Sequence, residues 1–279
     1  MAILLSLLTA ALFGTSDFFG GMAGKRIRIL QVLVCAHVIG GVGILPISLV
    51  IADQFRWEDL AWGAAAGSSG LVGLGLLYRG LARGPMGVVG ALTAITSAAV
   101  PAIWGTVVDG DELVVLAWIG VGVALVAIGL VSWSPDDAGA PVSAQTIIES
   151  LIAGAGFGFM FVVLDQTDPA SAPWPIVGAR MLTASILLAT FLVRRRQIWP
   201  REPSTLGLLI GVGLADTISN ALFLYSTQHG SLTVVAVLSS LYPVATVILA
   251  RTVLHERLTR LQLSGFVLAM GATALIAVG

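Results

Sequence analysis

Residues 229–276 of this 279-residue chain read HGSLTVVAVLSSLYPVATVILARTVLHERLTRLQLSGFVLAMGATALI. Two apolar segments, each close to the ~20 residues that a helix needs to cross the hydrocarbon core of a bilayer, flank a short charged segment. The charged segment runs from Arg251 to Arg257, and Arg260 follows just after it. Because so polar a segment cannot lie in hydrocarbon, the stretch predicts two membrane-spanning helices that are joined at a membrane surface.

A second stretch of the same kind lies earlier in the chain, at residues 84–131, and reads GPMGVVGALTAITSAAVPAIWGTVVDGDELVVLAWIGVGVALVAIGLV. Its glycines Gly84 and Gly120 correspond to Gly230 and Gly265, which lie 146 and 145 positions later. Other pairs at similar offsets are Phe13-Gly14 with Phe157-Gly158 and Ala36-His37 with Ala179-Arg180. These matches predict that the chain consists of two copies of one unit.

The composition excludes a soluble protein. Hydrophobic residues make up 57% of the chain and charged residues only 10%, with a mean hydropathy of +0.98. A soluble domain carries about 25% charged residues, so this chain has too little polar surface to cover an aqueous fold. We therefore predict a polytopic membrane protein. Its single cysteine, Cys35, excludes an intrachain disulfide.

Apolar segments separated by short polar breaks predict an all-α integral membrane protein with ten transmembrane helices. The predicted spans are 2–22, 30–51, 60–79, 86–107, 113–133, 146–164, 174–193, 205–226, 231–250 and 261–278. The longest polar break, SPDDAGAPVS at 134–143, falls near the middle and is typical of a linker. The predicted organisation is a first repeat at 1–133, a linker at 134–145 and a second repeat at 146–279.

The number of spans in each repeat determines the relative orientation of the two copies. Five is an odd number, so the second copy must lie upside down in the membrane relative to the first. Inverted repeats of this kind recur in secondary transporters, where the substrate site lies near the bilayer midplane between the halves. The pattern therefore favours two inverted five-helix repeats with a central site.

The distribution of basic residues predicts the orientation, because Lys and Arg are concentrated in cytoplasmic loops. Of the 14 Lys and Arg residues, Arg56 alone lies in the loops of one side, and Arg180 lies inside a span. The others follow the first, third, seventh and ninth spans: Lys25, Arg26, Arg28, Arg79, Arg83, Arg194, Arg195, Arg196, Arg201, Arg251, Arg257 and Arg260. This bias predicts a multi-pass cell-membrane (inner or plasma membrane) protein with termini outside and cytoplasmic loops between spans 1–2, 3–4, 5–6, 7–8 and 9–10.

The segment LSSLYPVATVILARTVLHERLTRLQLSGFVLAMG at 238–271 resembles the end of an EamA-type repeat of the drug/metabolite transporter superfamily. The stretches LFGTSDFFGG at 12–21 and LLYRGLARGPMGVV at 76–89 resemble the first repeat of that family, and GAGFGFMFVVLD at 154–165 resembles the start of the second. The resemblance implies a ten-helix secondary carrier that exports small metabolites.

The chain departs from the family pattern at two places. His255-Glu256-Arg257 stands where the family usually has Gly-Glu-Arg, and the corresponding part of the first copy, Asp109 to Glu112, lacks an Arg. The family is commonly expected to have cytoplasmic termini, whereas the distribution of Lys and Arg in this chain predicts termini outside. We follow the charge distribution.

Ionisable residues within membrane spans are costly, about 2.5–3.5 kcal/mol each on insertion scales, and are therefore candidates for function. Asp216 is the strongest, because Ser219 and Asn220 follow it at i+3 and i+4 on the same helix face. The functional interpretation is a site for a substrate ammonium group or a proton. The alternative is a structural bond between helices, for example to Arg180.

Three further ionisable residues lie within predicted spans. Arg180 could bind a substrate carboxylate bidentately or extend to the membrane interface. His37, its counterpart in the first repeat, is a proton-relay candidate or a satisfied structural hydrogen-bonding group. Asp17 shares a helix face with Gly14 and Gly21, and it is either a coupling carboxylate or an acid at the interface.

Uncharged polar residues form faces on the fourth and ninth predicted spans. The cavity-lining candidates are Thr93, Thr96, Ser97, Trp104, Ser239, Ser240 and Tyr242. The resemblance implies that these helices line the cavity, while the alternative for the Ser and Thr residues is packing between helices. Trp104 and Tyr78 could instead anchor the protein at a membrane interface, which is the safer interpretation. GxxxG spacings at Gly63/Gly67, Gly154/Gly158 and Gly207/Gly211 predict close helix crossings within the chain.

No sequence motif indicates an enzyme. His255-Glu256 is not followed by the second His of a zinc protease motif, no Walker-type phosphate loop is present, and Cys and His are too few for a metal cluster. We therefore expect no catalytic residues, no metal, no cofactor and no nucleic-acid partner.

The predicted function is secondary active transport, with export of a small metabolite such as an amino acid by alternating access around a central cavity. Protons are a candidate coupling ion, the lipid bilayer is the environment, and a monomer suffices although a homodimer is compatible. The alternatives are a carrier resembling a flippase for lipids or lipid-linked sugars, an intramembrane enzyme and a membrane protein without transport activity.

Overall fold

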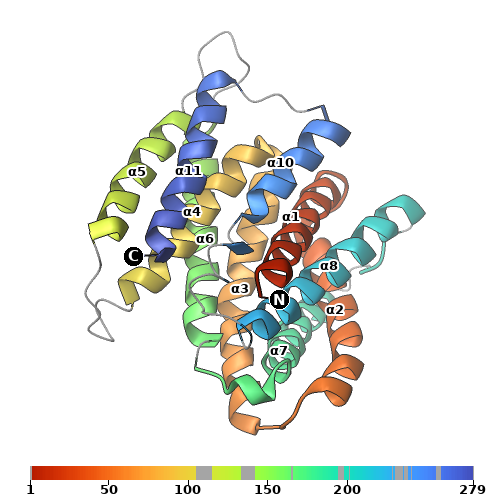
Figure 1. Ribbon diagram of the computed structural model, residues 1–279. Coiled ribbons are helices and arrows are strands. Elements are labelled where there is room, and N and C mark those ends of the chain that lie inside the picture. The colour runs from red at the N-terminus through yellow and green to blue at the C-terminus, as the bar shows by residue number, and fades with distance from the viewer. Residues whose placement is uncertain are drawn as a thin grey trace.

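The computed structural model describes residues 2–104, 115–132, 142–164, 166–193, 198–200, 202–227, 229, 235, 238–239, 241–255 and 259–278. These residues form helices and short turns, and no strand occurs among them (Figure 1). The helices are α1 (Ala2–Arg26), α2 (Ile29–Ile51), α3 (Trp57–Arg83), α4 (Met86–Trp104), α5 (Val115–Ser132), α6 (Ala144–Leu164), the 3-10 turn η2 (Pro169–Ser171), α7 (Trp174–Val193), α8 (Pro203–Thr227), α10 (Tyr242–Val253) and α11 (Arg260–Val278).

The all-helical class predicted from the sequence is confirmed. By length and composition, α1, α2, α3, α6, α7 and α8 are each able to cross a membrane, and shorter apolar helices occur at Met86–Ser97, Tyr242–Val253 and Leu263–Leu275. The ninth span was predicted at 231–250, whereas the described helix begins at Tyr242 and most of the preceding segment lies outside the described residues. The linker around 134–141, the segment at Asp109 and Ser240 also lie outside the described residues.

The charges at the ends of the helices agree with their dipoles. Glu58 and Asp59 lie in the first turn of α3, where the partial charge of the helix is positive, and Arg83 lies in its last turn. Lys25 and Arg26 similarly end α1. These charges mark the places where the helices leave the apolar layer.

The two halves of the chain are interleaved rather than side by side. Helix α3 packs against α6 and α7, α1 packs against α8 and α10, and α2 packs against α7 and α8 (Figure 1). In the predicted repeat, the counterparts of α1, α2, α3 and α4 are α6, α7, α8 and α10. The contacting pairs α3–α6, α3–α7 and α4–α6 therefore correspond to the pairs α8–α1, α8–α2 and α10–α1. All of these pairs are in contact. Three pairings thus recur between the halves, whereas α1–α3 and α4–α11 are in contact without a comparable contact, among the described residues, between their counterparts α6–α8 and α10–α5.

Glycines permit the closest of these crossings. A Cβ atom on Gly67 of α3 would lie 2.7 Å from the Cα atom of Ala179 on α7. On α6, a Cβ atom on Gly158 would lie 2.6 Å from the Cβ atom of Val100 on α4. Two of the GxxxG spacings therefore form the predicted close crossings within the chain. The third is mixed, because a Cβ atom on Gly211 would lie 2.7 Å from the ring of Phe19 on α1, whereas one on Gly207 would have no atom within 4 Å.

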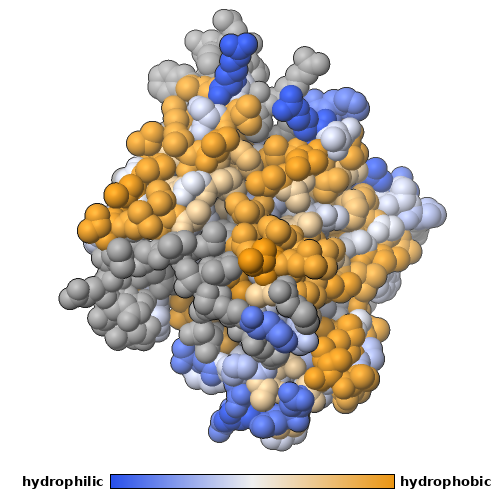
Figure 2. All heavy atoms as spheres, viewed as in Figure 1, coloured by the Kyte–Doolittle hydropathy of each residue, from blue (hydrophilic) through white to orange (hydrophobic). Residues whose placement is uncertain are grey.

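An apolar band crosses one face of the molecule between two polar ends (Figure 2). Figure 2 shows hydrophobic residues gathered across the middle of one face, with hydrophilic residues at its top and bottom. Leu49, Val50 and Val193 are among the large apolar side chains that are more than two-thirds exposed. Such exposure is unfavourable in water and normal in lipid, so the surface agrees with a multi-pass membrane protein.

Polar contacts at each end join helices of different halves. Where α1 and α3 end, Arg26 donates to Ser204 at the start of α8 (3.0 Å), and Arg79 forms a 3.3 Å ion pair with Glu149 of α6. At the opposite end of α3, Arg56 forms a 2.8 Å ion pair with Asp168 in the loop after α6. The basic and acidic groups of the loops thus occupy both ends of the bundle.

Candidate functional site

Arg180 on α7 and Asp216 on α8 form an ion pair in the interior of the bundle. The two residues are only 8% and 9% exposed. An unpaired charge in this position would be costly, and the opposite charge of the partner compensates for part of that cost. The predicted alternative in which Arg180 extends to the membrane interface is wrong, because its guanidinium lies inside the protein.

The polar stripe predicted on α8 is present and supports Asp216 from its own helix. Ser219 Oγ and Asn220 Nδ2 both donate to the backbone carbonyl of Asp216, at 2.8 and 2.7 Å. At the end of the stripe, the ring of Phe223 stacks on that of Phe161 from α6, with centroids 5.4 Å apart. The hydroxyl and amide therefore bond within the helix, and the carboxylate is left to bind Arg180.

Asp17 brings a second carboxylate from the first half to this pair. It is 6% exposed, and it makes no hydrogen bond or ion pair with any residue that the structure describes. It lies close enough to Asp216 for the two charges to interact, and its charge also interacts with the hydroxyl groups of Tyr78 and Tyr242. The first and second halves thus contribute one acid each to a common buried cluster.

His37 on α2 completes this cluster. Its ring is 3% exposed, and Nδ1 donates to the backbone carbonyl of Leu33 at 2.8 Å, as the structural alternative predicted. It also interacts electrostatically with Arg180, its counterpart in the repeat. The four ionisable residues that the sequence indicated separately therefore lie together, in a cluster of Asp17, His37, Arg180 and Asp216.

Ser16 was missed as a member of the site, and for Tyr78 the role of interface anchor was preferred to a place in the cavity. Tyr78 is fully buried, so its predicted role as an interface anchor is wrong. Its hydroxyl lies 3.3 Å from Ser16 Oγ, which also donates to the backbone carbonyl of Val212 on α8 (3.2 Å). The position of Ser16 directly before Asp17 is a weak sequence signal, but only the crossing of α1 with α3 and α8 brings these groups together.

Thr217 is a further buried polar group beside the cluster. It follows Asp216 on α8, is 3% exposed, and its Oγ1 atom has no hydrogen-bond partner within the described ranges. Gly40 of α2 packs directly against this hydroxyl. No sequence pattern singles out Thr217, because its surroundings depend on how closely α2 approaches α8.

The polar residues of α4 form hydrogen bonds within their own helix or to α6. Thr93 Oγ1 donates to the carbonyls of Val89 and Ser150 (2.9 and 3.2 Å), Thr96 Oγ1 donates to Leu92 (3.2 Å), and Ser97 Oγ donates to Ala94 (3.0 Å). Thr96 also packs on Gly154 of α6. These contacts support the packing alternative for the three residues.

The remaining cavity-lining candidates differ in their surroundings. Trp104 is 37% exposed and packs edge-on against Phe159 at 6.4 Å, which favours the anchoring interpretation over a cavity. Ser239 is 5% exposed, and its hydroxyl has no hydrogen-bond partner among the residues described. Tyr242 begins α10 and packs edge-on against Phe13 at 6.5 Å. Its hydroxyl has no hydrogen-bond partner among the described residues, and it interacts electrostatically with Asp17.

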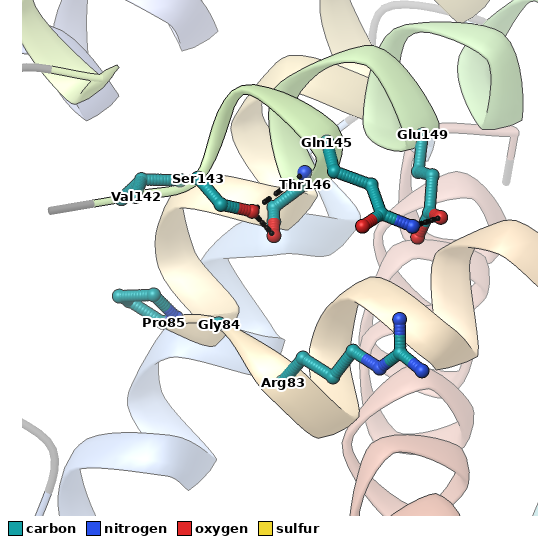
Figure 3. Close-up of a pocket in the computed structure, with 8 residues that line it drawn as sticks. All are labelled: Arg83, Gly84, Pro85, Val142, Ser143, Gln145, Thr146 and Glu149. Atoms are coloured by element: carbon teal, nitrogen blue, oxygen red, sulfur yellow. Dashed lines mark hydrogen bonds between the residues drawn. The ribbon is translucent and has the colours of Figure 1, made fainter. Parts of the chain in front are cut away.

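A separate pocket lies at one end of the bundle. It has a volume of about 200 Å³ and lies between the turn that joins α3 to α4 and the start of α6. Figure 3 shows Arg83 on one side of this pocket and Gln145, Thr146 and Glu149 on the other. Gln145 Nε2 donates to Glu149 at 2.7 Å. None of the four clustered ionisable residues lines this pocket.

Comparison with known proteins finds a family match in the second half of the chain. The profile of the EamA-like transporter family matches residues 145–278, which extend from α6 to α11. No curated protein matches the sequence. A solved structure described only as "Crystal structure of protein" is similar over 98% of this chain and 95% of its own, with a TM-score of 0.66 and 15% sequence identity. At that identity, the likeness shows a shared fold alone.

Proposed function

Because residues 145–278 match the EamA-like transporter family, we propose that the chain is an EamA-type member of the drug/metabolite transporter superfamily and a secondary transporter that exports a small metabolite such as an amino acid. A membrane transporter of this superfamily acts on a small molecule within a lipid environment. The proposed organisation is two inverted five-helix repeats that expose a shared site alternately to the two sides of the membrane.

The observation that carries this proposal is the buried Arg180–Asp216 pair with Asp17 beside it. Ionisable groups inside a membrane protein are costly and mark substrate or ion pathways. Here they come from both halves, because Asp17 lies on α1 and the pair lies on α7 and α8. The cluster thus has the position expected for a site between two inverted repeats.

The chemistry of the cluster suits a molecule with two opposite charges. The guanidinium of Arg180 can bind a carboxylate through two parallel hydrogen bonds, and Asp216 or Asp17 can bind an ammonium group. In the structure Arg180 and Asp216 bind each other. The two charges therefore compensate each other in the empty site. A zwitterion that enters would replace their mutual contact with one contact to each residue.

The contact pattern supports alternating access. Each long helix packs mainly on helices of the other half, so a tilt of one set of helices would change the environment of the cluster as a whole.

The orientation that we propose has the Arg26 and Arg83 end of the bundle in the cytoplasm and the Arg56 end outside, because basic loops are retained on the cytoplasmic side.

A ligand screen followed by an exchange assay tests the proposal. Purified protein would be melted in the presence of amino acids, amines, nucleosides and sugars, since a ligand that binds only the folded state raises the melting temperature. We expect one of these classes to stabilise the protein and to exchange across proteoliposomes that contain it. Stabilisation by none of them, together with no exchange above protein-free liposomes, would contradict a small-metabolite carrier.

A further inference from the structure

The pocket between the α3–α4 turn and the start of α6 has an unbalanced charge. Two of the residues that line it, Arg83 and Glu149, are charged and lie on opposite sides (Figure 3). Glu149 is compensated, because Arg79 forms an ion pair with it at 3.3 Å and Gln145 Nε2 donates to it at 2.7 Å. Arg83 is exposed and makes no hydrogen bond or ion pair with any described residue. Its guanidinium therefore leaves the pocket with one uncompensated positive charge.

The size and place of the pocket suit a small group at the membrane surface. Its volume of about 200 Å³ is several times the ~30 Å³ of one water molecule, and it is smaller than the ~300–1,000 Å³ of pockets that enclose drug-sized ligands. It lies where α3 ends at Arg83 and α6 begins at Ala144, which is the polar end of both helices. The group that fits is therefore small and anionic, and a whole metabolite would not be enclosed.

Apolar side chains continue from this pocket along the outside of α6. Ile148 and Ile152 are 56% and 48% exposed. They follow the lining residues Gln145 and Glu149 at i+3, on the same side of the helix. An acyl chain can therefore lie over the two isoleucines while the headgroup to which it is joined lies in the pocket. Inorganic phosphate would make no contact of this kind.

We propose that this pocket binds the phosphate group of an anionic phospholipid, with Arg83 as its cationic partner. A guanidinium binds a phosphate through two parallel hydrogen bonds, and the positive end of the α6 dipole favours the same charge. Basic pockets between membrane helices on the cytoplasmic side bind anionic headgroups, and this is the side that the distribution of Lys and Arg predicts for Arg83. A zwitterionic headgroup brings a cation with its phosphate, so it does not balance the charge of Arg83.

A lipid in this position would connect the two halves of the chain. Arg83 and Gly84 belong to the first half, whereas Gln145 and Thr146 belong to the second. Binding should therefore stabilise the contact between the α3–α4 turn and the start of α6. It does not depend on the proposed transport function, because none of the four clustered ionisable residues lines this pocket.

Native mass spectrometry of the full-length protein in detergent, with phosphatidylglycerol added, counts the bound lipids and measures their affinities. Arg83→Gln should weaken the binding of one lipid by about tenfold, which is the effect of one charge-assisted hydrogen bond. Arg83→Lys should bind with an intermediate affinity, because Lys keeps the charge but not the paired N–H groups. Arg251→Gln is the matched control, since it removes the same charge from an exposed arginine in the last turn of α10, outside the pocket.

Melting curves with different ligands identify the source of the phosphate. Phosphatidylglycerol should raise the melting temperature of the wild type and Arg251→Gln more than that of Arg83→Gln, because a ligand that binds only the folded state stabilises it. Phosphatidylcholine should affect the three proteins equally, and inorganic phosphate at the same concentration should give no shift. Curves without added lipid verify that the variants are folded.

Equal affinity losses in Arg83→Gln and Arg251→Gln would overturn the proposal. Retention of phosphatidylcholine as tight as that of phosphatidylglycerol, with the same dependence on Arg83, would also overturn it, because the charge of the headgroup would then not matter. A shift with inorganic phosphate as large as that with phosphatidylglycerol would show that a free anion binds in the pocket, and it would contradict the assignment to a lipid.

Discussion

The guanidinium of Arg180 and the carboxylate of Asp216 meet inside a bundle whose outer surface is apolar, and both side chains are about nine-tenths buried. Each residue lies in a predicted membrane span, and sequence alone allowed each to be functional or structural. The ion pair is compatible with both a structural and a functional role, because the two groups that hold α7 to α8 are also groups that a charged substrate can separate.

Breaking this pair should destabilise the protein. Arg180→Gln leaves Asp216 buried without compensation, and loss of one partner of a buried pair costs about 3–5 kcal/mol. Asp216→Asn should likewise be destabilising, because it leaves the buried guanidinium of Arg180 without its carboxylate partner. Thermal unfolding in detergent measures both. The controls are Arg26→Gln and Asp53→Asn at exposed positions, where about 0–1 kcal/mol is expected. Equal melting temperatures for all four variants would contradict a structural role for the pair.

Two glycines with the same GxxxG spacing should respond differently to substitution. A Cβ atom on Gly154 would overlap the side chain of Thr96, whereas one on Gly207 would meet nothing within 4 Å. Gly154→Ala should therefore lower the stability by about 1–3 kcal/mol through overpacking. Gly207→Ala should leave it unchanged or raise it slightly, because Ala is the better helix former. The melting temperatures of the two variants check this, and an equal loss in both would show that α6 does not cross α4 so closely.

Acid should weaken the loop contact between Arg56 and Asp168. The Ala170 N–H, and after it the Arg56 guanidinium, hold the pKa of Asp168 below its ordinary value, which is about 3.9 in an unfolded chain. A depressed carboxyl pKa gives stability that is present above the unfolded pKa and is lost as pH falls through the folded pKa. Asp168→Asn should therefore lose less stability than wild type between about pH 5 and pH 3. Asp53→Asn, at an exposed carboxylate, should behave as wild type, and a parallel acid dependence in Asp168→Asn would contradict the contact.

The orientation can be tested by cysteine labelling, because the single native cysteine, Cys35, is buried. We expect Asp53→Cys to react with a membrane-impermeant maleimide from outside intact cells. Ser204→Cys, which lies at the opposite end beside Arg26, should react only after the membrane is opened. The reverse pattern would show that the termini are cytoplasmic and that the distribution of Lys and Arg does not set the orientation here.

The helices could be predicted from sequence because each is a local apolar segment between polar breaks. The start of α7 at Trp174 and its end at Val193 agree with the predicted span. Helix α3 begins and ends beyond its predicted limits, at Trp57 and Arg83, because its charged first and last turns remain helical after the apolar segment ends. The apolar pattern of the sequence therefore predicts the part of a helix that lies in lipid, but it does not predict the full length of the helix.

The site was predictable only residue by residue. Charged residues in apolar spans are rare, so Asp17, His37, Arg180 and Asp216 were all identified. The pattern could not show that they lie together, because their contact depends on how helices distant in the chain cross. Tyr78 illustrates the difficulty, since an aromatic residue near the end of a span usually lies at the interface, whereas here α1 covers it completely.

Transport by purified protein in proteoliposomes tests the central claim most directly. Liposomes loaded with an unlabelled amino-acid mixture would be diluted into the same radiolabelled mixture, and exchange would be followed for the wild type, Arg180→Gln, Asp216→Asn, Asp17→Asn and the exposed-charge control Arg26→Gln. We predict accumulation by the wild type and Arg26→Gln, and a fall to the level of protein-free liposomes in the three cluster variants, each verified as folded by its melting curve. Exchange at the wild-type rate in all three cluster variants would contradict the assignment of the buried charges as the transport site.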